Sequence, residues 1–115
     1  MATLPLRPNT LQIDLDAAAH NARAVRALIG AERKLFAVVK ADGYGYGAAD
    51  MGAVFLRHGA DCLAVADLSE GVRLRGRGIV APILVYPNSL PEAAADTLAH
   101  GLIPTLVDPD AARAL

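Results

Sequence analysis

Short apolar runs alternate with helical patterns along this 115-residue chain, and the alternation limits the folds that it can adopt. Strands are expected where five such runs lie, at residues 11–15, 35–39, 62–66, 82–86 and 103–107. The first alternates apolar and polar residues, which is typical of a half-buried strand, and the second is apolar throughout. Helical patterns separate the runs, so the sequence predicts βα units and one parallel sheet.

Capping residues mark where the expected helices begin. A side chain that accepts a backbone N–H is favoured just before the first helical turn, and proline is favoured at its first position. The residues with this chemistry are Asp16 before a helix at 17–29, Asp67 with Glu70, Ser89 with Glu92 before a helix ending at His100, and Asp108 with Pro109. The two Asp/Ser–Glu pairs have capping-box spacing.

Two α/β architectures fit this order of elements. A (β/α)8 barrel of the TIM type needs roughly 250 residues, so the chain would supply about its first half, five βα units with strands in sequential order. A doubly wound five-stranded sheet fits the length but reverses its strand order. No linker interrupts the chain, so residues 1–115 are expected to form part of one domain, with no second domain. The last helical pattern reaches Leu115 without a C-cap, which favours the half barrel.

Composition excludes several classes of protein. With 11 Lys and Arg against 12 Asp and Glu, and no basic run, a nucleic-acid partner is not expected. The sequence contains no apolar stretch of about 18 residues, and residues 1–12 do not have the pattern of a signal peptide. We therefore expect a cytoplasmic protein without a membrane partner. A single cysteine, Cys62, fits that compartment, and three histidines without ligand spacing predict no metal site.

One lysine lies where an α/β protein places its chemistry. Lys40 ends the apolar strand at 35–39 and opens a loop rich in glycine and tyrosine, within AVVKADGYGYG at residues 37–47. The carboxyl ends of parallel strands are where ligands bind, and desolvation favours the uncharged amine, a nucleophile toward aldehydes. The glycine spacing matches neither a dinucleotide fingerprint nor a phosphate-binding loop. Position alone favours a strand-end lysine that reaches water beside a flexible turn, but a simple turn rarely needs three glycines and two tyrosines together.

The stretch AVVKADGYGYGA closely resembles the pyridoxal-phosphate lysine motif of bacterial alanine racemases, usually written A-V-V-K-A-x-A-Y-G-H-G. Three flanking segments follow the family pattern in order and spacing, at residues 13–21, 59–67 and 81–85, and so do Ser69 and Glu70. The resemblance therefore extends from about Ile13 to the end of the chain, and it implies the barrel architecture.

The resemblance also implies a role for each of five residues. Lys40 is the catalytic residue, which binds pyridoxal phosphate covalently and exchanges the substrate α-proton on one face of the cofactor. Tyr44 donates a hydrogen bond to the cofactor phosphate. Val38, Leu84 and Tyr86 flank the cofactor at the ends of strands.

The chain departs from the family pattern at some positions, and some functional residues of the family are not among residues 1–115. The chain has Gly43 where alanine is usual, Tyr46 where histidine is usual, and Tyr86 where an aliphatic side chain is more common. The family's second base is a tyrosine in the partner subunit's C-terminal domain, and an arginine faces the pyridine nitrogen. Neither belongs to this chain, so the isolated chain is expected to be inactive.

The implied function is pyridoxal-phosphate-dependent interconversion of L- and D-alanine, which supplies D-alanine for peptidoglycan. The substrate is a small amino acid, and the full-length protein is expected to be a homodimer. Two alternatives share the barrel and the lysine: a non-catalytic pyridoxal-phosphate-binding homeostasis protein, and another barrel enzyme such as an amino-acid decarboxylase or D-threonine aldolase. Tyr44, four residues after Lys40, favours the racemase.

Overall fold

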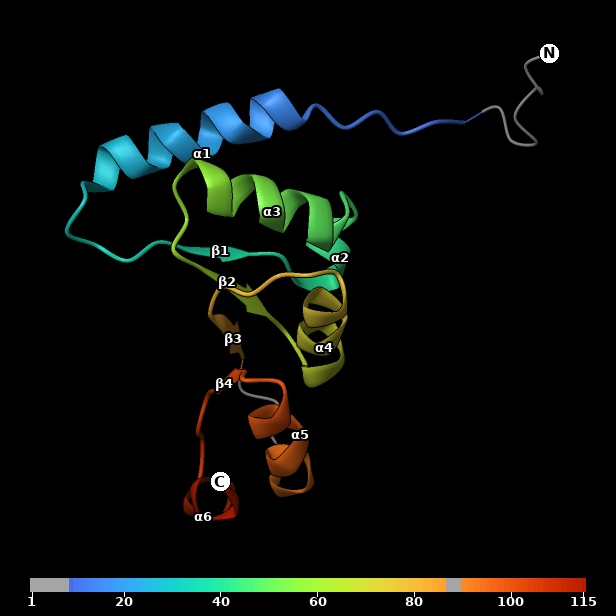
Figure 1. The fold of residues 1–115 in the computed structure, drawn as a ribbon, viewed down its shortest axis with the longest axis vertical. Helices are drawn as coiled ribbons and strands as arrows, with labels where there is room; N and C mark the ends of the chain where they lie inside the picture. Colours follow the sequence, from blue (N-terminus) through green and yellow to red (C-terminus); the bar gives the residue numbers. More distant parts are fainter. Residues whose placement is uncertain (1–8, 87–89) are drawn as a thin grey trace.

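The computed structural model describes residues 9–86 and 90–115 (Figure 1). In order along the chain, the elements are α1 (Leu15–Ile29), β1 (Phe36–Val38), α2 (Lys40–Tyr44), α3 (Ala48–His58), β2 (Cys62–Val65), α4 (Leu68–Gly76), β3 (Ile83–Val85), the 3-10 helix η1 (Pro91–Ala93), α5 (Ala94–Ala99), β4 (Ile103–Pro104) and α6 (Pro109–Ala114).

The four strands form one parallel sheet in the order β1-β2-β3-β4. Each strand is a neighbour of the next along the chain, and helices lie between them (Figure 1). This sequential order is the one expected for a barrel wall, whereas a doubly wound sheet would place a later strand beyond the first. The expected parallel α/β arrangement is therefore confirmed.

The prediction of a strand at residues 11–15 is wrong. Residues 9–14 have no regular secondary structure and extend away from the rest of the molecule, and α1 already begins at Leu15 (Figure 1). Asp14, rather than Asp16, is the N-cap, and its carboxylate accepts the Ala17 N–H at 3.0 Å. The alternation at 11–15 is real, but a strand also requires a neighbour to pair with, and the described residues provide none there.

Two of the other expected helix caps are confirmed. The Asp67 carboxylate accepts the Glu70 N–H at 2.9 Å, and the Asp108 carboxylate accepts the Ala111 N–H at 2.7 Å. The Glu70 carboxylate binds other N–H groups, so the capping box is only half formed. Ser89 lies outside the described residues.

The last strand is shorter than expected. The apolar run at 103–107 forms only β4, Ile103–Pro104. Proline has no N–H, so Pro104 cannot donate to the ladder. The next contact with β3 comes from a side chain instead, because the Thr105 hydroxyl donates to the Val85 carbonyl at 2.7 Å.

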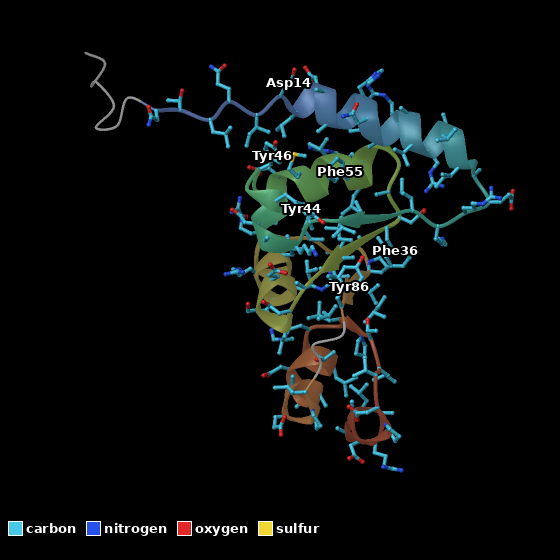
Figure 2. All side chains as sticks on the ribbon, turned by 180° about the vertical axis from the view of Figure 1, so that it is seen from behind. Asp14, Phe36, Tyr44, Tyr46, Phe55 and Tyr86 are labelled. Atoms are coloured by element: carbon cyan, nitrogen blue, oxygen red, sulfur yellow. The ribbon has the colours of Figure 1, made fainter. Side chains whose placement is uncertain are left out.

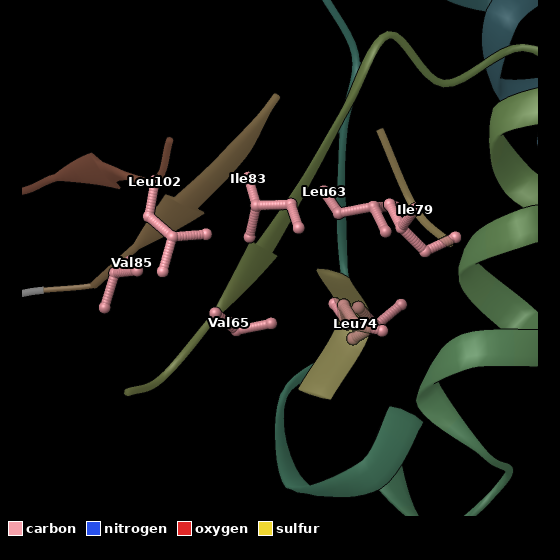
Figure 3. Packing of buried hydrophobic residues seen from close by; sticks show 8 residues of the cluster. Leu63, Val65, Leu74, Ile79, Ile83, Val85 and Leu102 are labelled. Atoms are coloured by element: carbon pink, nitrogen blue, oxygen red, sulfur yellow. The ribbon is translucent and has the colours of Figure 1, made fainter. Parts of the chain in front are cut away.

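The main core lies on one face of the sheet, against α3 and α4 (Figures 1 and 3). Its buried members are Val39, Leu63, Val65, Leu74, Ile79, Ile83, Val85 and Leu102. Figure 3 shows Leu63 and Ile83 side by side on neighbouring strands, with Leu74 of α4 nearby. All four residues of β2 are buried. We call the face that bears this core the helix-covered face.

Asp61 links the end of α1 to the start of the sheet. Its carboxylate accepts the Leu35 N–H at 2.7 Å and pairs with the Arg26 guanidinium, which also donates to the Gly59 carbonyl. The Leu35 N–H, followed by the Arg26 side chain, lowers the pKa of Asp61. Both partners stabilise the charged carboxylate, so folding favours its ionised form.

We therefore expect Asp61 to contribute to acid stability. A carboxylate whose pKa is lowered by folding stabilises the protein above its ordinary pKa, and this contribution is lost as the pH falls through the lowered value. Asp61→Asn should reduce the free energy of unfolding at neutral pH and should flatten its decline in acid. Urea unfolding across this pH range checks this.

Asp110→Asn is the matched control, because Asp110 pairs with Arg113 on the exposed surface, where ion pairs contribute little. A difference between wild type and Asp61→Asn that is constant with pH would contradict the assignment.

No described helix has the length and apolar character needed to cross a membrane. Nor do the described parts of the chain contain a cluster of three or more histidine, cysteine or acidic side chains that could hold a metal ion.

Candidate functional site

The sequence-predicted site residues lie along the carboxyl ends of β1 and β3. Lys40 follows β1 after one residue. Tyr86, labelled in Figure 2, follows β3 directly. Sheet hydrogen bonds continue past the strands, because the N–H groups of Val39 and Tyr86 donate to the carbonyls of Ala64 and Val65, both at 2.9 Å. The ends of β1, β2 and β3 are therefore held together at one edge of the sheet.

Two predicted cofactor contacts share one row of the sheet. Val38 is in register with Ala64, and Ala64 with Leu84. Residues in register on parallel strands have their side chains on the same face, and here that face is opposite the helix-covered face. Val38 and Leu84 are two strands apart, which is about 10 Å. By the same alternation Tyr86, two residues after Leu84, belongs to this face.

Lys40 opens an unusual turn. In α2 the residues after it have left-handed backbone angles, with φ/ψ of 50/48° at Ala41, 53/47° at Asp42 and 65/37° at Gly43, and φ of 57° at Tyr44. Left-handed geometry costs about 1–2 kcal/mol for each residue other than glycine. Such strain persists only where the surroundings hold it, and it is concentrated at functional sites.

The glycines of this segment complete the turn. Gly45 and Gly47 have φ of 88° and 92°, which glycine adopts at little cost. The Gly47 N–H donates to the Asp42 carbonyl at 2.8 Å, and the Asp42 carboxylate accepts the Ala48 N–H at 3.0 Å, at the start of α3. The alternating glycines thus serve a compact turn between Lys40 and α3, and Asp42 is its internal anchor.

Glu70 is a site residue whose contact with the turn the sequence did not indicate. One carboxylate oxygen accepts the Ala41 N–H and the other accepts the Ala66 N–H, both at 2.7 Å. The capping-box spacing identified Glu70 as a helix-start residue, but a contact across the sheet leaves no local pattern. Only the fold brings the start of α4 beside the end of β1.

The Lys40 and Tyr44 side chains are accessible from solvent. Lys40 is half-buried, and none of the ion pairs between described residues involves it. Tyr44 is 60% exposed. A hollow of about 210 Å³ beside the turn is lined by Val38, Val39, Gly43, Tyr44, Tyr46, Met51 and Phe55. Ligand pockets usually enclose about 300–1,000 Å³, so this hollow alone is smaller than a typical ligand pocket.

The structure thus brings four of the five predicted residues into two groups. Val38 and Tyr44 line the hollow, while Val38, Leu84 and Tyr86 belong to one face of the sheet. Lys40 lies between Val38 and Tyr44 in the chain, directly before the left-handed turn. Chemically, the site combines a primary amine, a phenol and an apolar surface at the carboxyl edge of a parallel sheet.

Comparison with known proteins identifies the family. Residues 13–115 match the family described as "Alanine racemase, N-terminal domain". The alanine racemase of Synechocystis is 43% identical over 104 residues, which are 90% of this chain and 28% of that protein. The alanine racemase of Symbiobacterium thermophilum is 44% identical over 110 residues, 96% of this chain and 29% of that protein.

Solved structures agree with the sequence relatives. The alanine racemase of Bacillus anthracis with bound L-Ala-P has a TM-score of 0.84 at 34% identity, covering 88% of this chain and 26% of that one. That of E. faecalis has a TM-score of 0.85 at 30% identity, covering 89% and 28%. The chain thus spans less than a third of these relatives, and its parallel sheet corresponds to part of their barrel domain. On the family match and these relatives, the chain belongs to the alanine racemase N-terminal domain family.

Proposed function

We propose that this chain carries the pyridoxal-phosphate-binding lysine of an alanine racemase, and that residues 1–115 are the N-terminal part of its barrel domain. The observation that supports this best is the place of Lys40, at the carboxyl edge of the sheet beside the apolar row of Val38 and Leu84. The racemase pattern of residues 37–47 and the named relatives support the same assignment.

The side chains present fit pyridoxal phosphate. Its aldehyde needs a primary amine, which Lys40 supplies, and only one other lysine, Lys34, occurs in the chain. Its phosphate needs hydrogen-bond donors, and the exposed Tyr44 hydroxyl can donate one. Its ring needs an apolar support, which the row of Val38 and Leu84 with Tyr86 can provide.

When bound, pyridoxal phosphate supplies an electron sink for negative charge at the substrate α-carbon. The Lys40 Nζ would hold the cofactor at its aldehyde carbon, and as a free amine it would supply the base. We propose that this nitrogen removes the α-proton of one enantiomer from one face and, in the reverse direction, delivers a proton to that same face. Tyr44 would hold the phosphate through a hydrogen bond donated by its hydroxyl.

The further properties of the whole racemase are part of the same proposal. They are the use of L- and D-alanine as substrates, the supply of D-alanine for peptidoglycan, assembly as a homodimer and a cytoplasmic location. Each rests on the resemblance to alanine racemases, of which this chain spans less than a third.

Borohydride trapping tests the proposal. The chain is incubated with pyridoxal phosphate and reduced, and the modified lysine is identified by peptide mass spectrometry. We expect the label on Lys40 in large excess over Lys34, which is exposed and serves as an internal control. Lys40→Arg should abolish this selective labelling, and Lys34→Arg should leave it unchanged. Equal labelling of the two lysines would overturn the assignment.

A further inference from the structure

The Glu70 carboxylate bridges the ends of two neighbouring strands. Its two oxygens accept the N–H groups of Ala41, after β1, and Ala66, after β2, both at 2.7 Å. The last sheet bond before this point runs from the Val39 N–H to the Ala64 carbonyl. Beyond the last backbone hydrogen bond between β1 and β2, the Glu70 carboxylate therefore links the two chain segments that follow these strands.

Glu70 is itself held firmly. It is the third residue of α4, and its own N–H donates to the Asp67 carboxylate at 2.9 Å. That carboxylate also accepts the Ser69 hydroxyl. These contacts, led by the Ser69 hydroxyl and the Glu70 N–H, lower the pKa of Asp67 and keep the cap charged. The side chain of Glu70 thus projects from a fixed helix start toward the turn.

The hydrogen bond from the Ala41 N–H to Glu70 lies where the left-handed turn begins. Ala41 is the residue directly after Lys40 and the first of the left-handed series. Its N–H lies in the first turn of α2, where no carbonyl of the turn itself accepts it, and Glu70 supplies the acceptor. The other anchors, the Val39 carbonyl on the Gly43 N–H and the Asp42 carboxylate on the Ala48 N–H, bind later in the turn. Glu70 alone among these restrains the peptide that joins Lys40 to Ala41.

We propose that Glu70 is a positioning residue, which fixes the Lys40–Ala41 peptide and thereby the direction in which the lysine leaves β1. Its consequence for the cofactor rests on the proposed function of Lys40. Its structural part, a clamp on the Ala41 and Ala66 amides, does not depend on that function. The clamp stabilises the left-handed turn before any ligand binds, so the Lys40 amine is presented in one orientation.

Hydrogen exchange of the 115-residue chain without pyridoxal phosphate tests the clamp. We expect Glu70→Ala to speed exchange of the Ala41 and Ala66 amides at least tenfold, while the Leu63 amide, bonded to the Pro82 carbonyl, keeps its protection. Glu70→Gln retains one acceptor oxygen, so it should release one of the two amides. Glu32→Gln is the matched control, since Glu32 is exposed in the turn after α1.

Unchanged Ala41 and Ala66 exchange in both Glu70 variants would overturn the clamp. Loss of Leu63 protection in both would also overturn it, because Glu70 would then support the whole fold rather than this turn.

Borohydride trapping then tests the consequence for Lys40. In Glu70→Ala we expect the ratio of labelled Lys40 to labelled Lys34 to fall at least tenfold, with no change in Glu32→Gln. An unchanged ratio despite faster Ala41 exchange would overturn the positioning role. If the wild type shows no preference for Lys40, the proposed function fails, and the exchange data still decide whether Glu70 clamps the turn.

Discussion

The 115-residue chain supplied with pyridoxal phosphate is expected to leave L-alanine unracemised. Racemisation removes a proton from one face of the α-carbon and delivers one to the other, so it needs a base on each face. Lys40 is the base that we assign to one face, and the resemblance places the second, a tyrosine, in the partner subunit's C-terminal domain. A positioned acid–base group contributes about 10²–10⁴-fold, so its loss alone removes most turnover.

The measurement is formation of D-alanine from L-alanine by the wild-type chain and by Lys40→Ala. Both are expected to be indistinguishable from the buffer with cofactor. Turnover in the wild type that disappears in Lys40→Ala would mean that a second base lies within these residues. The phenols of Tyr44, Tyr46 and Tyr86 would then be the side chains to replace one at a time by phenylalanine.

The inner strands were predictable because a strand that is buried on both faces consists mainly of apolar residues. The run at 62–66 is apolar throughout, and β2 is buried on both faces. The alternation at 11–15 looked equally strong, yet it formed no strand. Periodicity reports what a segment could bury, whereas a strand also needs a neighbour whose presence no local pattern reveals. The same limit applies to Glu70, whose partner Ala41 is 29 residues away.

The backbone at the candidate site was the least predictable feature. Lys40 and the glycines pointed to the right edge of the sheet, but nothing in the sequence indicated left-handed angles at Ala41, Asp42 and Tyr44. Propensity disfavours them there, and tertiary contacts override it. Non-glycine residues with left-handed backbone angles therefore mark the candidate site, and only the structure reveals them.

Leu63→Ala is expected to cost about 3–4 kcal/mol of unfolding free energy. Leu63 has no exposed surface and occupies the middle of the sheet against α3. Truncating such a leucine loses its transfer free energy and leaves a cavity that the neighbours fill only in part. Domains have about 5–15 kcal/mol in all, so this loss would be a large share of the free energy of unfolding.

Leu28→Ala is the matched control for urea unfolding followed by circular dichroism. The chemistry is the same, but Leu28 is 86% exposed on α1, so the change should be within about 0.5 kcal/mol. Similar losses in the two variants would contradict the placement of Leu63 at the centre of the core.

The contact between α3 and Leu63 can also be tested at Gly52. The effect of Gly52→Ala on the free energy of unfolding should change sign when Leu63 is replaced by alanine. A Cβ at Gly52 of α3 would lie 2.8 Å from the Leu63 Cδ1, which is closer than real atoms approach, and the buried leucine has little room to move. Gly52→Ala alone should therefore destabilise the chain. In the Leu63→Ala background the new methyl enters vacated space, and alanine is preferred over glycine inside a helix by about 1 kcal/mol. There Gly52→Ala should stabilise, giving a coupling of about 1–3 kcal/mol between the two positions. An equal effect of Gly52→Ala in both backgrounds would show that α3 does not rest on Leu63.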